Sequence, residues 1–252
     1  MPLQRPRRLA HHIARSLHSG AVVMMLAVPR VSAAQSTTNE HAWASIFGEH
    51  RVNATWHGYW EFSARRHELG RTWQQQLGAF GASRDLGPNW RATAAMGWSN
   101  TFRYGETPIR ANAFELRPWV QIVGNRRRGR VTWTERNRLE MRNVVPYTER
   151  APDDPSWTTQ WRLRRMDRVV VPFRSGGAWY AAGSQEWFVV PAPTGPQRHL
   201  EQTRTQLLVG KVVSPTLRIE GGYMFQAFWR RTTDELNHTV LIVTRWSAPI
   251  PR

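Results

Sequence analysis

The stretch Pro215–Arg230 constrains the fold most, because its side chains alternate in character along its whole length. One file is mostly apolar and ends in aromatic residues, and the other is mostly polar. The first holds Leu217, Ile219, Gly221, Tyr223, Phe225, Ala227 and Trp229, and the second holds Arg218, Glu220, Gly222, Met224, Gln226, Phe228 and Arg230. A period of two indicates a β-strand with two different faces. Strands of soluble proteins average about 5–6 residues, whereas a strand that crosses a membrane needs roughly 9–11 and belongs to a barrel with aromatic girdles. The stretch therefore favours a membrane-crossing barrel strand.

The same design recurs along the chain. Alternating segments cover 43–52, 56–66, 72–84, 90–103, 112–124, 130–144, 157–173, 178–190, 198–212, 217–230 and 238–246. Tight turns and longer loops, among them 231–237, alternate between them, which is typical of outer-membrane barrels. We predict an all-β, antiparallel up-and-down transmembrane β-barrel of 10–12 strands. Because an all-antiparallel closed barrel needs an even number, we expect ten or twelve strands, with the first segment and the region 156–173 least certain.

The N-terminal residues are typical of a secretory signal peptide. Arginines precede the short apolar run Ala21–Val28, and the small residues Ser32, Ala33 and Ala34 follow it. The alternative is a disordered basic tail with an isolated apolar patch. We predict a signal peptide over 1–34, a flexible lead-in over 35–41, a barrel over 42–248 and a short tail over 249–252. Such a protein is expected in the outer membrane of a Gram-negative bacterium, in contact with its lipid bilayer.

The polar files carry the candidate binding residues. With the apolar files facing lipid, they line the interior of a narrow barrel: Arg136, Arg138, Glu140, Arg162, Arg164, Glu186, Arg204, Arg218, Glu220 and Gln226. Mixed arginine and glutamate side chains can brace the wall through charge-assisted hydrogen bonds, or they can form a pore that attracts anions. Glu135 and Asn137 break the pattern, because they lie on an otherwise apolar file. In a soluble barrel or sandwich the apolar files would face inward instead.

The segment from about Trp133 to Trp246 resembles the DUF2490 family of bacterial outer-membrane-like β-barrel proteins. The resemblance lies in the runs 136–140, 162–168, 185–188 and 202–207, in Gly222-Tyr223 with Gln226, and in Asn237-His238. It implies a barrel fold and an outer-membrane location, and it implies no reaction. Glu186, Arg204 and Asn237 would be family-pattern positions with luminal, structural roles.

Other functions find less support in the sequence. A lipid-modifying hydrolase would need an activated serine, and Ser99 with His238 is the pair we consider; we expect no catalytic residues. The chain has a formal charge of +17 and no cysteine, and we expect no metal site and no cofactor. Its arginines alternate along strands, so we expect no nucleic-acid partner. Lipopolysaccharide and small anions are candidate partners, and we favour a monomer.

Overall fold

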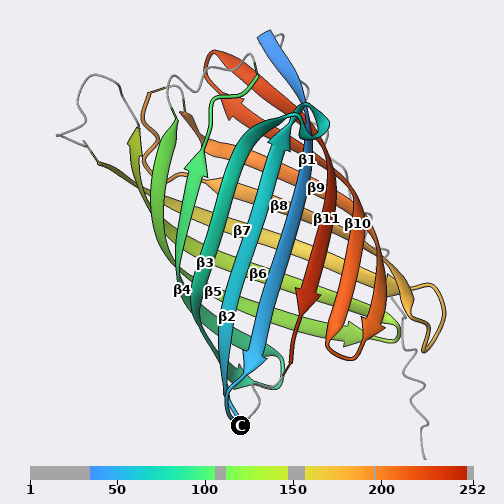
Figure 1. The fold of residues 1–252 in the computed structure, drawn as a ribbon. Helices are drawn as coiled ribbons and strands as arrows, with labels where there is room; N and C mark the ends of the chain where they lie inside the picture. The colour runs from blue at the N-terminus through green and yellow to red at the C-terminus, as the bar shows by residue number, and fades with distance from the viewer. Residues whose placement is uncertain (1–34, 106–111, 147–156, 196, 249–252) are drawn as a thin grey trace, which may run out of the picture. The chain divides into compact units, whose positions relative to one another are not determined.

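The computed structural model describes residues 35–105, 112–146, 157–195 and 197–248. Their strands form one closed barrel (Figure 1). The strands are β1 (Gln35–Arg51), β2 (Trp56–His67), β3 (Thr72–Gly87), β4 (Trp90–Thr101), β5 (Ala113–Arg128), β6 (Val131–Pro146), β7 (Thr158–Pro172), β8 (Trp179–Val189), β9 (Gln197–Ser214), β10 (Leu217–Arg230) and β11 (Thr233–Trp246). One 3-10 turn, η1 (Glu68–Gly70), lies between β2 and β3. The predicted all-β, up-and-down barrel is confirmed.

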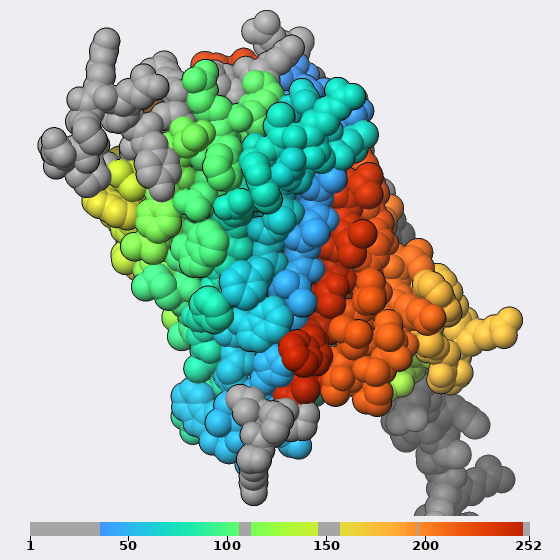
Figure 2. All heavy atoms as spheres, viewed as in Figure 1, coloured from blue at the N-terminus to red at the C-terminus, as the bar shows by residue number. Residues whose placement is uncertain are grey.

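The barrel closes through its first and last strands, which run parallel. Each strand from β1 to β11 pairs antiparallel with the next one along the chain, and β1 pairs with β11 from Gln35↔Thr233 to Gly48↔Trp246. Figure 2 shows these two strands, blue and red, side by side in one continuous wall. The eleven strands fall within the expected range. Our even-number argument was wrong, because a single parallel pair allows an odd number of strands to close.

Both ends of the predicted barrel differ from the structure. Residues 35–41, which we expected to be a flexible lead-in, are the first part of β1 and pair with β11. Likewise β11 begins at Thr233, so most of the expected loop 231–237 is strand. Backbone pairing extends each strand where the polar sequence suggested a loop. The predicted signal peptide and C-terminal tail lie outside the described residues.

The connections divide the barrel into two rims. The turn rim holds the connections 52–55, 88–89, 129–130, 173–178 and 215–216. The loop rim is the opposite one, where the chain passes from β2 to β3, β4 to β5, β6 to β7, β8 to β9 and β10 to β11. Gly129, with φ of 59°, turns the chain between β5 and β6 in a backbone conformation that favours glycine. Because the strand number is odd, β1 starts at the loop rim and β11 ends at the turn rim.

The two faces of the wall have the polarity expected for lipid outside and charge inside. On β10, Ile219 and Tyr223 are exposed, whereas Glu220, Met224 and Gln226 are buried in the interior. Large apolar side chains are exposed all around the outer wall, among them Phe80 on β3, Val120 on β5 and Leu207 on β9. Part of the interior is apolar as well, where Trp43, Leu208, Met224 and their neighbours pack together. None of the helices among the described residues is both long and apolar enough to cross a membrane.

Candidate functional site

The interior is organised around one carboxylate, Glu140 on β6, whose relative exposure is 0%. Arg162 Nη2 lies 2.6 Å from its Oε2, Arg164 Nη1 lies 2.6 Å from its Oε1, and Arg138 Nη1 lies 3.6 Å from Oε1. Register explains the arrangement, because Glu140 is paired with Arg162 and Arg138 with Arg164 across β6 and β7. Alternation on both strands then turns all four side chains to the inside.

A second carboxylate extends this arrangement. Glu186 on β8 accepts hydrogen bonds from Arg136 Nη2 at 2.5 Å and from Arg164 Nη2 at 2.7 Å. Arg164 therefore joins the two carboxylates, and we call Arg136, Arg138, Glu140, Arg162, Arg164 and Glu186 the central charge layer. Each carboxylate in the layer faces at least two guanidinium groups, so both charges remain ionised while buried.

A third group of charges continues the layer toward the loop rim. Glu115 accepts hydrogen bonds from Arg117 Nε at 2.7 Å and from Arg142 Nε at 2.8 Å. Glu201 is shared, because it lies 3.3 Å from both Arg142 and Arg162. The ion pairs thus run without interruption across β5, β6, β7, β8 and β9, which ties the wall together from within.

Arg204 is held differently, by amides and aromatic rings. With the oxygen of its amide turned toward these donors, Gln202 accepts hydrogen bonds from Arg204 Nε at 2.5 Å and from Gln226 Nε2 at 2.6 Å. Gln226 Oε1 in turn accepts a hydrogen bond from Asn237 Nδ2 at 3.1 Å. Its guanidinium lies 4.7 Å from the centre of the Phe188 ring and 5.2 Å from that of Trp43. Arg162 and Arg164 also lie over Phe188, at 5.3 and 4.5 Å. Arg204 thus packs against the central charge layer through this ring.

These side chains fill the barrel at their level. Water hardly reaches this level from either rim, because the side chains that meet there are all buried: Arg138, Glu140, Phe188, Gln202 and Gln226. The described part of the interior is therefore closed at the central charge layer.

A second closure lies toward the loop rim. Tyr104, in the connection after β4, donates a hydrogen bond to Glu235 Oε1 at 3.0 Å. Its ring lies 5.4 Å from that of His41 and 5.5 Å from that of His67. Burial, together with the charge of Glu235, raises the pKa of the Tyr104 hydroxyl above its usual range, so it remains a donor. The Tyr104 side chain therefore lies inside the barrel, against β1, β2 and β11.

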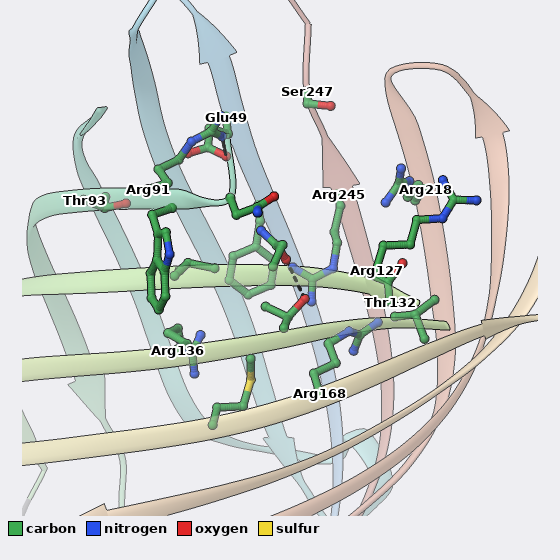
Figure 3. Close-up of a pocket in the computed structure, with 18 of the residues that line it drawn as sticks. Glu49, Arg91, Thr93, Arg127, Thr132, Arg136, Arg168, Arg218, Arg245 and Ser247 are labelled. Carbon is green, nitrogen blue, oxygen red and sulfur yellow. Dashed lines mark hydrogen bonds and ion pairs between the residues drawn. The ribbon is translucent and has the colours of Figure 1, made fainter. Parts of the chain in front are cut away.

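The turn rim opens into a cavity of about 720 Å³, which we call the vestibule (Figure 3). Arg136 and Arg138 of the central charge layer line it, so it ends on the closed layer. Among the described residues its lining holds eight arginines and three carboxylates; the arginines are Arg91, Arg127, Arg130, Arg136, Arg138, Arg168, Arg218 and Arg245, and the carboxylates are Glu49, Asp85 and Glu220. The vestibule therefore carries a large excess of positive charge.

That excess is unevenly distributed. On one side Arg91 is neutralised by Glu49 at 2.5 Å and Asp85 at 2.6 Å. On the other side one carboxylate, Glu220, serves both Arg168 at 2.5 Å and Arg245 at 3.4 Å. Figure 3 shows Arg168, Arg218 and Arg245 on the side away from Glu49 and Arg91.

Three further arginines of the vestibule differ from these. Arg127, Arg130 and Arg218 form no ion pair with any carboxylate in the part of the chain that the structure describes. Cationic groups that no described carboxylate neutralises attract soluble anions.

The ten residues singled out from the sequence all lie inside the barrel wall. Six of them form the central charge layer, and Arg204 with Gln226 packs beside it. Glu220 is separate and bonds Arg168, Arg245 and Tyr180. Arg218 lies at the exposed mouth of the vestibule. The ten residues predicted from the sequence therefore belong to two different places in the barrel, the interior around the central charge layer and the vestibule.

Ser99 and His238 are not brought together. Ser99 is buried inside β4, whereas His238 is exposed on the outer face of β11. The Nδ1 atom of His238 lies 2.6 Å from the Tyr223 hydroxyl oxygen, which is its hydrogen-bond partner. In the described chain no group of three or more His, Asp or Glu residues is placed to hold a metal ion.

Sequence reasoning missed several members of the ion-pair system. Glu115 and Arg117 lie two residues apart on the inward file of β5, and the alternation of that segment carried enough signal to find them. The ion pair of Glu220 with Arg168 was missed because β7 lies three strands from β10, and only the curvature of the barrel brings them together. Arg245 lies on the neighbouring β11, two residues from Val243, which pairs with Glu220.

Comparison with known proteins gives a family for this chain. The family model described as "Protein of unknown function (DUF2490)" matches residues 40–237, which include most of the barrel. No curated protein matches the chain. The chain belongs to the DUF2490 family.

Proposed function

We propose that this protein is an outer-membrane barrel that binds small anions in its vestibule and does not conduct them. The observation that carries the proposal is the vestibule itself: a cavity of about 720 Å³, lined by eight arginines and three carboxylates, that ends on the buried central charge layer. The role proposed is one of binding and support, without catalysis.

The polarity of the wall supports the membrane placement. A barrel in water would bury its apolar files, whereas here Phe80, Val120 and Leu207 point away from the interior and are exposed. Tryptophans near strand ends, such as Trp56, Trp90 and Trp246, fit an interfacial aromatic belt. In the usual orientation of such barrels the shorter connections face the periplasm, so the vestibule would open there, in a Gram-negative outer membrane.

The closed layer favours binding over transport. A conducting pore requires a continuous path of water-accessible side chains, and Glu140, Phe188 and Gln226 block that path in the described interior. The sequence left bracing of the wall and attraction of anions as alternatives. We assign the bracing role to the central charge layer and the anion-attracting role to the vestibule. The hydrolase alternative loses support, since Ser99 and His238 lie on opposite faces of the wall.

The test of anion binding uses inorganic pyrophosphate and the refolded barrel in lipid vesicles. We expect saturable binding by calorimetry that weakens with added salt, because exposed charges are screened. The variant Arg218→Ala with Arg245→Ala should weaken binding at least tenfold. Arg174→Ala is the matched control, since Arg174 is exposed in a turn-rim connection and does not line the vestibule. Equal binding by both variants would refute the vestibule as the site.

The test of closure is the electrical conductance of the protein in a planar bilayer. We expect no stepwise current in symmetric chloride, and the same result for the Arg218→Ala, Arg245→Ala protein. Steady anion-selective steps that disappear with Arg136→Ala would establish the pore instead.

A further inference from the structure

The outer wall carries a connected cluster of charged and polar side chains within its largely apolar surface. We call it the polar wall row: Glu135 and Asn137 on β6, Arg165 and Asp167 on β7, and Gln185 on β8. Register places these side chains together, because Glu135 pairs with Asp167, Asn137 with Arg165, and Asp167 with Gln185. They are the residues that break the apolar file of their strands, and they all point outward.

Arg165 is the centre of the row. It bonds Asp167 at 2.7 Å, Glu135 at 2.9 Å and Asn137 at 3.2 Å, and its side chain is still 40% exposed. Trp133 Nε1 donates to Asp167 Oδ1 at 3.3 Å. Glu135 and Asp167 share Arg165, and Glu135 also accepts a hydrogen bond from Arg126 Nη2 on β5 at 3.2 Å, so the charges of the row are matched by partners that remain partly exposed.

The row lies at the height of the apolar band. On β7, Arg165 and Asp167 are flanked by the exposed Trp161 and Leu163 on one side and by Val169 and Val171 on the other. Charged side chains on the lipid face of a barrel are unfavourable near the middle of the bilayer, and ionisable groups there generally face a polar partner. Lipid tails offer no such partner.

An apolar groove adjoins the row on β7, β8, β9 and β10. Its volume is about 330 Å³, and Ala181, Gly183 and Gly221 are among the small residues that line it. Leu207 forms part of its edge and, at 66%, is the most exposed of the large apolar side chains described. Groove and protruding side chain thus occur together on one surface, as a self-complementary contact requires.

We propose that the polar wall row and this groove form the surface through which two copies of the chain associate in the membrane. A second copy presents polar groups at the same depth, so a two-fold contact can place Arg165 of each copy against the carboxylates of the other. The small residues of the groove beside the row let the two walls approach closely. Polar groups and closely approaching small residues are what hold membrane proteins together within lipid. The inference rests on the proposed membrane placement and revises our expectation of a monomer.

The first experiment locates the contact. Because the chain has no cysteine, single cysteines can be introduced at Gln185, in the row, and at Phe80, which is exposed on β3. In vesicles at low protein density, a flexible bis-maleimide should link Gln185→Cys copies into dimers, with at least tenfold less dimer for Phe80→Cys. Equal linking of both proteins, or none in either, would overturn the proposal.

The second experiment measures association by energy transfer between labels on Ser247→Cys copies. Replacing Glu135, Arg165 and Asp167 with leucine should lower the ratio of dimer to monomer at least tenfold, because leucine suits the lipid face. The control replaces Phe80, Met96 and Val120 with leucine and should leave the ratio unchanged. No energy transfer with the unmodified row would contradict the proposal.

Vesicle flotation separates this inference from the membrane placement. A protein that floats with the vesicles but stays monomeric, or that is captured only by added lipopolysaccharide, refutes self-association alone. A protein that does not float refutes both proposals.

Discussion

The central charge layer makes Glu140→Gln the most informative single substitution. Glutamine keeps the size of the side chain but removes the charge that faces Arg162 and Arg164, each 2.6 Å away, in a site with 0% exposure. Removing one partner of a buried ion pair costs about 3–5 kcal/mol, because the remaining charge is left without compensation. Glu186 and Glu201 still serve these arginines, so we expect the lower end, a loss of about 3 kcal/mol in the free energy of unfolding.

The assay is urea unfolding of the barrel in phospholipid vesicles, followed by tryptophan fluorescence. Glu40→Gln is the matched control, because Glu40 is exposed on β1, and it should change the free energy of unfolding by less than about 0.5 kcal/mol. A double-mutant cycle with Arg162→Gln should give a coupling energy of about 0.5–3 kcal/mol. A loss below about 1 kcal/mol for Glu140→Gln would refute the layer as the brace of the barrel.

Three other predictions concern different parts of the barrel. In Tyr104→Phe, the free energy of unfolding should decline less at alkaline pH than in the unmodified protein. The raised pKa of the Tyr104 hydroxyl contributes stability that is fully present below about pH 10 and is lost as the pH rises further. An unchanged pH profile would contradict this. Gly210→Ala should lower the free energy of unfolding by about 1–3 kcal/mol, because a β-carbon there would overlap the Tyr180 ring. Full stability in the same urea assay would rule out the packing described. Cysteines at Ser36 and Ser247 should react with a membrane-impermeant maleimide from opposite sides of oriented vesicles, since β1 starts at one rim and β11 ends at the other. Labelling of both from one side would exclude the parallel closure.

The sequence was sufficient to predict the strands and the faces of the barrel. Alternation is a local property, so Glu220 and Gln226 could be assigned to the inside, and Tyr223 to the outside, from β10 alone. The strand ends were harder to predict, because Gln35–His41 is polar and becomes strand only through pairing with β11. That pairing joins the first and last strands of the barrel, and no local sequence pattern predicts it.

The sites were predicted less well than the fold. A list of inward arginines does not show which are neutralised: Arg164 has two carboxylate partners, whereas Arg218 has none among the described residues. The difference depends on the register between strands, because both partners of Arg164 lie on β6 and β8, the two strands that pair with β7. Glu135 and Asn137 were visible as exceptions to the pattern, but their partner Arg165 emerged only from the register of β6 and β7.

The central claim, that the outer wall faces lipid and the interior does not, can be tested directly on β10. Single cysteines from Leu217 to Arg230, each carrying a spin label, report whether a position is reached by oxygen dissolved in lipid or by a water-soluble nickel complex. We predict that accessibility to oxygen alternates with a period of two along β10. Labels at Ile219 and Tyr223 should be accessible to oxygen, and labels at Met224 and Gln226 should be reached by neither reagent. Nickel access at Ile219 and Tyr223, or oxygen access at Met224 and Gln226, would contradict it.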